Sequence, residues 1–164
     1  MDRALLQKAN WGQILPIALT ATAIIVVDQV TKFVVRAHLA LGESIFEVSP
    51  IRILRVNNTG SAFGLFDGQT LPLIIASIIA IAVMAYFYRR LGAAGPLFRL
   101  SLGMQLGGAV SNLADRIRDG HVTDFVDFRV WPVFNAADAS ITVGIVLLIV
   151  LVLFSDRDAR SAVG

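Results

Sequence analysis

The sequence predicts an all-helical integral membrane protein, a bundle of four transmembrane helices with a small β-rich segment on the membrane surface. Hydrophobic residues make up 56% of its 164 residues and charged residues only 16%, whereas a soluble domain usually carries about 25% charged residues. The mean hydropathy is +0.73. Four apolar stretches are each long enough for one crossing of roughly 17–25 helical residues, and none is long enough for two. These predicted spans are residues 14–33, 71–88, 97–113 and 136–154.

The charge and the scarce residue types exclude several classes of protein. A net charge of only +2 does not suggest a nucleic-acid partner, and the high apolar content excludes a disordered chain. The absence of cysteine excludes disulfide scaffolds, thiolate metal sites and a lipid-modified cysteine on this chain. With two histidines, a histidine-built zinc site is not expected either. We therefore expect no metal and no cofactor.

The boundaries of the predicted helices carry local signals. The first stretch follows basic residues, as in a signal peptide, but it is too long for one and three further spans follow. Pro72 and Pro96 stand where a first helical turn tolerates a missing N–H. Asn135 is a good N-cap for the last helix, and Asp138 then lies in its first turn. We found no internal repeat and expect a single membrane domain over residues 1–164.

The remaining sequence lies mainly between the first and second spans and between the third and fourth. Residues 42–68 contain a β-leaning run, 51–56, that ends in a turn signal at residues 57–60. Residues 121–131 read as extended, and Pro132 prevents a continuous helix. We predict that these segments form a small sheet on the membrane surface.

The distribution of charge predicts an orientation. Seven basic residues flank the bundle on each side, so a bare count decides nothing. The short connection between the second and third spans is dense in arginine, with Arg89, Arg90 and Arg99, and short loops weigh most in setting topology. We therefore expect both termini in the cytoplasm. Nine of the twelve acidic residues then lie toward the outer side, which suggests a function there.

Polar residues inside the spans are the first functional candidates. Asp28 and Lys32 are four residues apart and share a helix face, either as an ion pair reaching toward the headgroups or as part of a site. Small residues at helical spacing, namely Gly103, Gly107 and Ser111, predict close helix packing. The neighbouring face carries either a ligand-facing row or an interhelical hydrogen-bond clamp, formed by Gly108, Asn112 and Asp115 with Arg116 beside them.

Two aspartates form the strongest chemical signal. Asp124 precedes Asp138 by 14 residues, and the loop between them is long enough to bring both to one site at the membrane boundary. A carboxylate pair that shares a proton supplies one acid and one base, as water-mediated amide hydrolysis requires. Carboxylate pairs also serve proton-coupled transport, and Asp138 alone could be a plain cap-region carboxylate. The residues by themselves leave these alternatives open.

The ordered set of motifs resembles that of bacterial lipoprotein signal peptidases (signal peptidase II). The resemblance runs from the first span to the last and is carried by Asp28-Gln-Val-Thr-Lys32, Asn58-Thr-Gly-Ser-Ala-Phe63, Gly107-Gly108-Ala109 with Asn112, Asp115-Arg116, Gly120-His-Val-Thr-Asp124-Phe125 and Phe134-Asn135-Ala-Ala-Asp138. Each motif alone is weak, but together they are specific. Ser61 and Ala136 depart from the usual pattern, and neither is one of the acids.

The resemblance implies an aspartic endopeptidase of the bacterial inner membrane with a periplasmic site. Such enzymes cleave prolipoproteins just before the cysteine that carries a diacylglyceryl group, without a metal or a covalent intermediate. The resemblance assigns Asp124 and Asp138 to catalysis, and it leaves Asp127 outside the pair. It assigns substrate binding to Asn58, Gly60, Asn112, Arg116 and Asn135, and structural support to Asp28, Lys32, Gly108 and Asp115. The alternatives are a small proton-coupled transporter or channel subunit and a purely structural protein.

Overall fold

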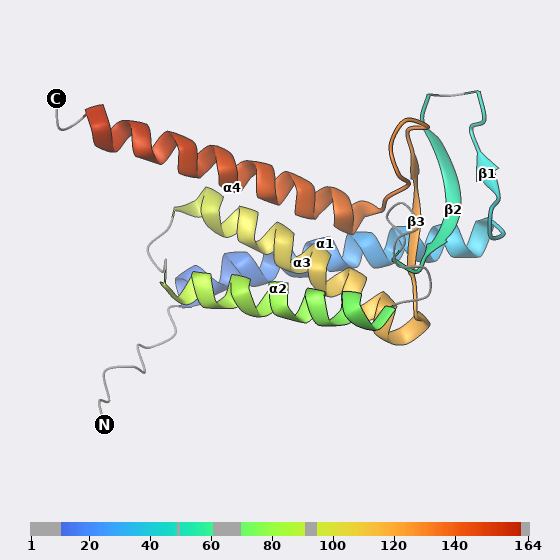
Figure 1. Cartoon of the computed structure of the whole chain (residues 1–164), viewed down its shortest axis with the longest axis horizontal. Helices are drawn as coiled ribbons and strands as arrows, with labels where there is room; N and C mark the ends of the chain where they lie inside the picture. Colours follow the sequence, from blue (N-terminus) through green and yellow to red (C-terminus); the bar gives the residue numbers. More distant parts are fainter. Residues whose placement is uncertain (1–10, 49, 61–69, 91–94, 162–164) are drawn as a thin grey trace.

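Four long helices and a small antiparallel sheet make up the described part of the protein (Figure 1). The computed structural model describes residues 11–48, 50–60, 70–90 and 95–161. Its elements, in chain order, are α1 (Trp11–His38), β1 (Ser44–Ile45), β2 (Arg52–Asn58), α2 (Thr70–Arg90), α3 (Pro96–Asp119), β3 (Val122–Asp127) and α4 (Ala136–Ser161). The mostly helical fold predicted from the sequence is confirmed.

All four predicted spans are helical, and every helix is longer than its predicted span. Because a helix keeps its hydrogen bonds beyond the apolar stretch, hydropathy marks the span and not the helix ends. Pro72 lies in the first turn of α2 and Pro96 begins α3, as predicted. Within the part of the chain that the structure describes, residues Gly12–His38 of α1 and Ala136–Phe154 of α4 meet the length and hydropathy expected of a membrane span, and the apolar part of α2, Thr70–Tyr86, is shorter.

Helix α3 lies at the centre of the bundle, with α1, α2 and α4 packed against it. Close approach depends on glycine. A Cβ atom at Gly107 would lie 2.7 Å from the carbonyl oxygen of Ala21 on α1, and one at Gly108 would lie 2.5 Å from the carbonyl oxygen of Ala137 on α4. A Cβ at Gly103 would meet Thr20 at 2.6 Å. The small-residue stripe therefore packs α3 against α1, as the spacing predicted.

The three strands pair antiparallel in the order β1-β2-β3. Strand β2 covers the run predicted to be extended except for Ile51, and β3 lies within the extended segment predicted at 121–131. The register places Val56 opposite Asp124 and Asn58 opposite Val122. Phe125 on β3 packs against Val35 and Leu39 near the end of α1. The sheet therefore lies at the C-terminal end of α1 (Figure 1).

Some predicted features lie outside the described residues. The predicted outer segment 42–68 is described at residues 42–48 and 50–60, so residues 61–63, the second half of the motif that begins at Asn58, are not described. The same holds for residues 91–94 of the arginine-dense connection between α2 and α3.

Candidate active site

A buried ammonium group connects α1 to α3 next to the site. The side chain of Lys32 is fully buried, and its Nζ lies 2.6 Å from Asp28 Oδ2 and 2.7 Å from Asp115 Oδ2. It also donates a hydrogen bond of 2.8 Å to Asn112 Oδ1. The predicted Asp28–Lys32 ion pair is present, but the prediction that it reaches toward the headgroups is wrong. A second carboxylate and an amide on α3 hold the ammonium group inside the bundle.

The two carboxylates of this cluster also accept hydrogen bonds from α1, α3 and α4. Asp28 accepts hydrogen bonds from Ser111 Oγ on α3 (2.7 Å) and from the backbone N–H of Ala137 at the start of α4 (2.8 Å). Asp115 accepts one from Gln29 Nε2 on α1 (2.9 Å). The basic residues that form ion pairs with Asp115 are Lys32 and Arg118, whereas its chain neighbour Arg116 lines the cavity described below.

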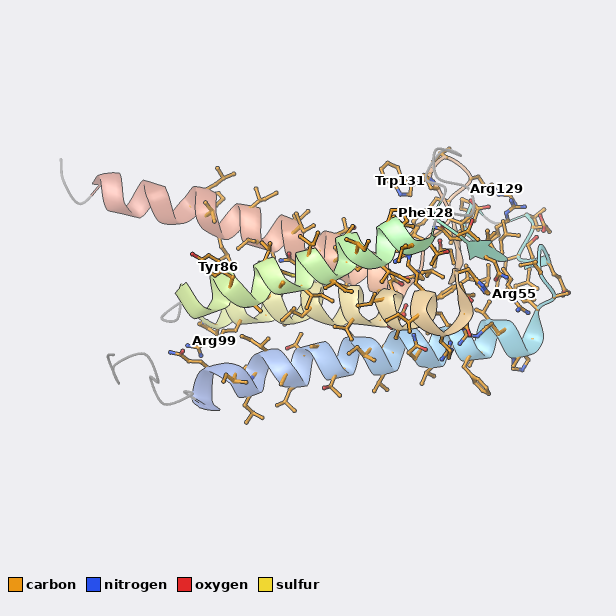
Figure 2. The ribbon with its side chains drawn as sticks, turned by 60° about the horizontal axis from the view of Figure 1, so that its bottom comes forward. Arg55, Tyr86, Arg99, Phe128, Arg129 and Trp131 are labelled. Atoms are coloured by element: carbon orange, nitrogen blue, oxygen red, sulfur yellow. The ribbon has the colours of Figure 1, made fainter. Side chains whose placement is uncertain are left out.

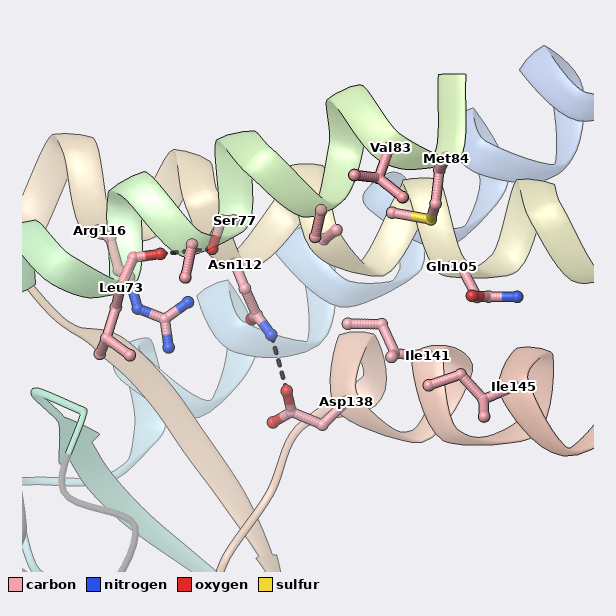
Figure 3. Close-up of a pocket in the computed structure, with 13 residues that line it drawn as sticks. Leu73, Ser77, Val83, Met84, Gln105, Asn112, Arg116, Asp138, Ile141 and Ile145 are labelled. Carbon is pink, nitrogen blue, oxygen red and sulfur yellow. Dashed lines mark hydrogen bonds between the residues drawn. The ribbon is translucent and has the colours of Figure 1, made fainter. Parts of the chain in front are cut away.

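Two asparagine amides connect the cluster to the candidate acids. The Oδ1 atom of Asn112 accepts the bond from Lys32, and its Nδ2 donates to Asp138 Oδ1 at 2.7 Å (Figure 3). The Nδ2 of Asn135 donates to Asn112 Oδ1 at 3.2 Å and to Asp124 Oδ1 at 2.6 Å. Since Lys32 can only donate, it fixes which end of the Asn112 amide faces Asp138.

The N-terminus of α4 holds Asp138 in place. The backbone N–H of Asp138 donates to Asn135 Oδ1 at 2.9 Å, and the backbone N–H of Asn135 donates to Asp138 Oδ2 at 3.3 Å. This reciprocal pattern is a capping box, and it confirms Asn135 as the N-cap. A carboxylate in the first turn is stabilised by the positive end of the helix dipole.

Asp124 reaches the same site from the sheet. Its Oδ2 accepts a hydrogen bond of 2.8 Å from Asn58 Nδ2 on β2, and its Oδ1 accepts the bond from Asn135. The residue is only 2% exposed. Burial and the nearby charge of Asp138 raise the pKa of Asp124 to about 7, although the hydrogen bonds from Asn58 and Asn135 oppose this shift. Strand β3 and the start of α4 thus bring both predicted acids to one place.

Gly60 and Asn58 form the tip of the site on the β2 side. The backbone N–H of Gly60 donates to Asn58 Oδ1 at 2.8 Å, which leaves the Asn58 Nδ2 for Asp124. Gly60 has a φ of +109°, and a Cβ there would collide with the side chain of Leu73. Both the backbone conformation and the space at this position therefore require glycine.

A cavity of about 480 Å³ opens beside the carboxylates between α2, α3 and α4. Asn112, Arg116 and Asp138 line one end, while Val83, Met84, Ile141 and Ile145 line the rest (Figure 3). The Nε of Arg116 is buried and has no hydrogen-bond partner within the part of the chain that the structure describes. The site thus places the carboxylate of Asp138 and the guanidinium group of Arg116 at one end of an apolar cavity, with Asp124 joined to them through the amides.

Asp127, three residues after Asp124 on β3, belongs to a separate network. Its Oδ2 accepts a hydrogen bond of 2.6 Å from Arg52 Nε, and its Oδ1 accepts one of 2.6 Å from the backbone N–H of Arg129. The Arg52 hydrogen bond, followed by that from Arg129, holds the pKa of Asp127 below its usual range. Side chains three apart on a strand point to opposite faces, which explains the separation.

Sequence reasoning missed one participant. Gln29 donates to both Ser111 Oγ and Asp115 Oδ1, each at 2.9 Å, and so joins α1 to α3. A glutamine next to Asp28 inside an apolar span was itself a signal, because polar side chains are rare there unless they have partners.

The chain is similar to known proteins over most of its length. The sequence profile of a family described as Signal peptidase (SPase) II matches residues 20–154. A lipoprotein signal peptidase of Moorella thermoacetica is 38% identical over 135 residues, covering 82% of this chain and 90% of that protein. One from Pelotomaculum thermopropionicum is 41% identical over 139 residues, covering 84% and 91%. A bacterial membrane enzyme solved by the in meso method superposes with a TM-score of 0.76 at 31% identity, covering 87% of this chain and 90% of that one.

The Lys32 cluster generates a prediction about stability. Lys32→Met removes the only cation that both Asp28 and Asp115 contact in the described structure, and it leaves two buried carboxylates facing each other. Breaking a buried ion pair by removing one partner typically costs about 3–5 kcal/mol. Thermal unfolding in detergent should therefore show a large loss of stability.

The matched control is Arg118→Gln. Arg118 also contacts Asp115, at 3.4 Å, but its side chain is 54% exposed. Exposed pairs contribute about 0–1 kcal/mol, so this variant should melt close to the wild type. Similar melting temperatures for the two variants would contradict a structural role of the buried ammonium group.

Proposed function

The chain belongs to the signal peptidase II family, whose members remove signal peptides from prolipoproteins, and we propose that Asp124 and Asp138 carry out this hydrolysis together. One observation carries the proposal: both carboxylates accept hydrogen bonds from a single network of amides at the polar end of an apolar cavity. The family match favours peptide hydrolysis over the proton-coupled transport that the two acids alone left open.

In the proposed mechanism a water molecule attacks the peptide bond, and the two aspartates act as general base and general acid. Asp138, ionised at the N-terminus of α4, takes a proton from water as the water oxygen attacks the scissile carbonyl carbon. Asp124, which holds a proton near neutral pH, donates it to the carbonyl oxygen. In the second half, Asp138 protonates the leaving nitrogen as the C–N bond breaks, and Asp124 recovers its proton from the diol as the new carboxyl group forms. Because the two carboxylates are coupled, the pH dependence of the reaction reports the titration of the pair.

Other residues would position the substrate and the acids. Arg116 and Asn112 face the cavity beside Asp138, where they would hold backbone carbonyls of an extended signal peptide. Asn58, Gly60 and Asn135 would complete the binding site on the side of the sheet. Asp28, Lys32, Asp115 and Gly108 would act as support, the three charged residues by fixing the Asn112 amide and Gly108 by allowing α3 to approach α4.

We further propose that the substrate carries a diacylglyceryl group on the cysteine that follows the cleaved bond. The family resemblance suggests this group, and the apolar wall of the cavity is suited to it. No metal, cofactor or nucleic acid has a part in the proposed reaction.

We propose that all four helices cross the bacterial inner membrane as one domain. The 21 residues of α2 span about 31 Å, close to the roughly 30 Å thickness of the hydrocarbon region. Most polar residues of α3 are buried among the other helices, including Ser101, Gln105 and Asn112. Aromatic and basic side chains lie at both ends of the bundle, Tyr86 and Arg99 at one and Arg129 and Trp131 at the other, as at two membrane interfaces (Figure 2). The site at the sheet end would face the periplasm, and both chain termini the cytoplasm.

The first functional prediction concerns the two acids. Asp124→Asn and Asp138→Asn keep the size of each side chain but remove its ability to exchange a proton. Each should lower the rate of cleavage of a diacylglyceryl-modified prolipoprotein by about 10²–10⁴-fold or more. Turnover should be measured per folded molecule, with folding assessed by gel filtration and thermal melting.

Asp127→Asn provides the matched control, because it makes the same change on the same strand outside the amide network. It should retain most of the activity. If either Asp124→Asn or Asp138→Asn turned over substrate at the wild-type rate, the proposed acid–base pair would be wrong.

The second functional prediction concerns orientation. The chain has no cysteine, so single cysteines report cleanly on accessibility. Val48→Cys, near the sheet, should react with a membrane-impermeant thiol reagent in intact spheroplasts, whereas Gly95→Cys, at the start of α3, should react only after lysis. Both positions are exposed in the structure, so burial does not confound the comparison. The reverse pattern would invert the proposed orientation.

A further inference from the structure

A second cavity continues the first one away from the carboxylates. It has a volume of about 370 Å³ and is lined by Phe98 and Leu102 of α3 and by Leu148 and Val152 of α4. Val83, Met84 and Gln105 line both cavities and therefore mark their junction. In Figure 3 these three side chains lie at the end of the first cavity that is remote from Asp138. The apolar space thus extends along the bundle from the catalytic carboxylates.

The lengths of the two cavities can be measured along α4. Asp138 and Ile145 bound the first cavity, and seven residues of helix separate them by about 10 Å. Val152 in the second cavity lies about 21 Å from Asp138. One leaflet of the hydrocarbon region, and hence one extended lipid chain, measures about 15 Å. An extended lipid chain that starts beside Asp138 is therefore longer than the first cavity, and its end lies in the second.

The shape and chemistry of the space match a single chain. A twelve-residue helix about 10 Å wide occupies on the order of 1,400 Å³, far more than either cavity holds. The two polar side chains that line the second cavity bind to the protein itself: Gln105 Nε2 donates to Ser101 Oγ at 3.1 Å, and Ser101 Oγ donates to the carbonyl oxygen of Gly144 at 2.8 Å. The second cavity therefore fits an apolar ligand that is narrower than a helix.

We propose that the two cavities form one channel for a single acyl chain of the diacylglyceryl group, and that the second cavity sets how long a chain is accepted. The acyl chain passes the junction formed by Val83, Met84 and Gln105, and its end contacts Leu148 and Val152. This inference rests on the proposed function, because it assumes that the diacylglyceryl cysteine is held beside Asp138.

Chain-length preference tests the channel. Val152→Trp adds bulk to the second cavity, and the position tolerates it because Val152 is 56% exposed. The variant should lower the ratio of kcat/KM for a substrate with leaflet-length chains to that for a short-chain substrate by about tenfold, the low end of what one methylene group can cost in an apolar pocket. The short chains are chosen to end within the first cavity, at about 10 Å.

Val150→Trp is the matched control, with the same substitution two residues away. Val150 is 42% exposed and lines neither cavity, so its variant should leave the ratio at the wild-type value. The channel is rejected if Val152→Trp leaves the ratio unchanged, or if both variants change it equally.

A binding measurement separates failure of the channel from failure of the proposed function. A diacylglyceryl-cysteine peptide with a photoreactive group at the end of each long chain is bound to the Asp124→Asn protein and irradiated. Crosslinks should map to residues around Leu148 and Val152 and disappear with excess unlabelled peptide. Crosslinks spread over lipid-facing residues only would overturn the channel, even if cleavage were normal. Crosslinks in the channel without cleavage by the wild type would instead refute the proposed function alone.

Discussion

The ammonium group of Lys32 is the interaction on which the rest of the structure depends. It is fully buried, contacts Asp28 on its own helix and Asp115 on α3, and donates to the amide of Asn112. A charge in this position would be very unfavourable without partners, so the three groups require one another and bring α1 against α3. The second oxygen of Asp28 binds the first turn of α4 through the N–H of Ala137. The cluster thus sets the position of the helix that carries Asp138.

The orientation of the site follows from that cluster by hydrogen-bond direction alone. Asn112 accepts from Lys32 and Asn135, so its NH₂ group must face Asp138. Asn135 uses its oxygen to cap α4 and its nitrogen to reach Asp124. The sheet contributes the remaining donor: Asn58 lies diagonally across from Asp124 in the β2–β3 register and reaches its second oxygen. Two carboxylates from different elements are thereby surrounded by amides, which can donate to them without adding a positive charge.

The features predictable from the sequence were local ones. Helical stretches, the capping box at Asn135 and the stripe at Gly103 and Gly107 are set by neighbours within a few residues, and the structure contains them all. The partner of Lys32 was only half predicted, because Asp28 is one turn away while Asp115 is 83 residues further along the chain. Hydropathy predicted α3 to be a span like the others. It could not predict that the surrounding helices bury the polar residues of α3. Motif resemblance, and not spacing, assigned roles to Asn112, Arg116 and Asn135.

The central claim is that burial and the closeness of the two carboxylates keep one proton on the pair formed by Asp124 and Asp138 at neutral pH. Infrared difference spectroscopy of protein with isotope-labelled aspartate measures this proton directly through the stretch of a protonated carboxyl group. Because burial and the charge of Asp138 raise the pKa of Asp124 to about 7, the account predicts a carboxyl band that is strong below that pH and fades as the pH rises through it. The band should be missing from Asp124→Asn and retained in Asp127→Asn. A band that titrates near the ordinary aspartate value of about 4, or one that persists unchanged in Asp124→Asn, would contradict the account.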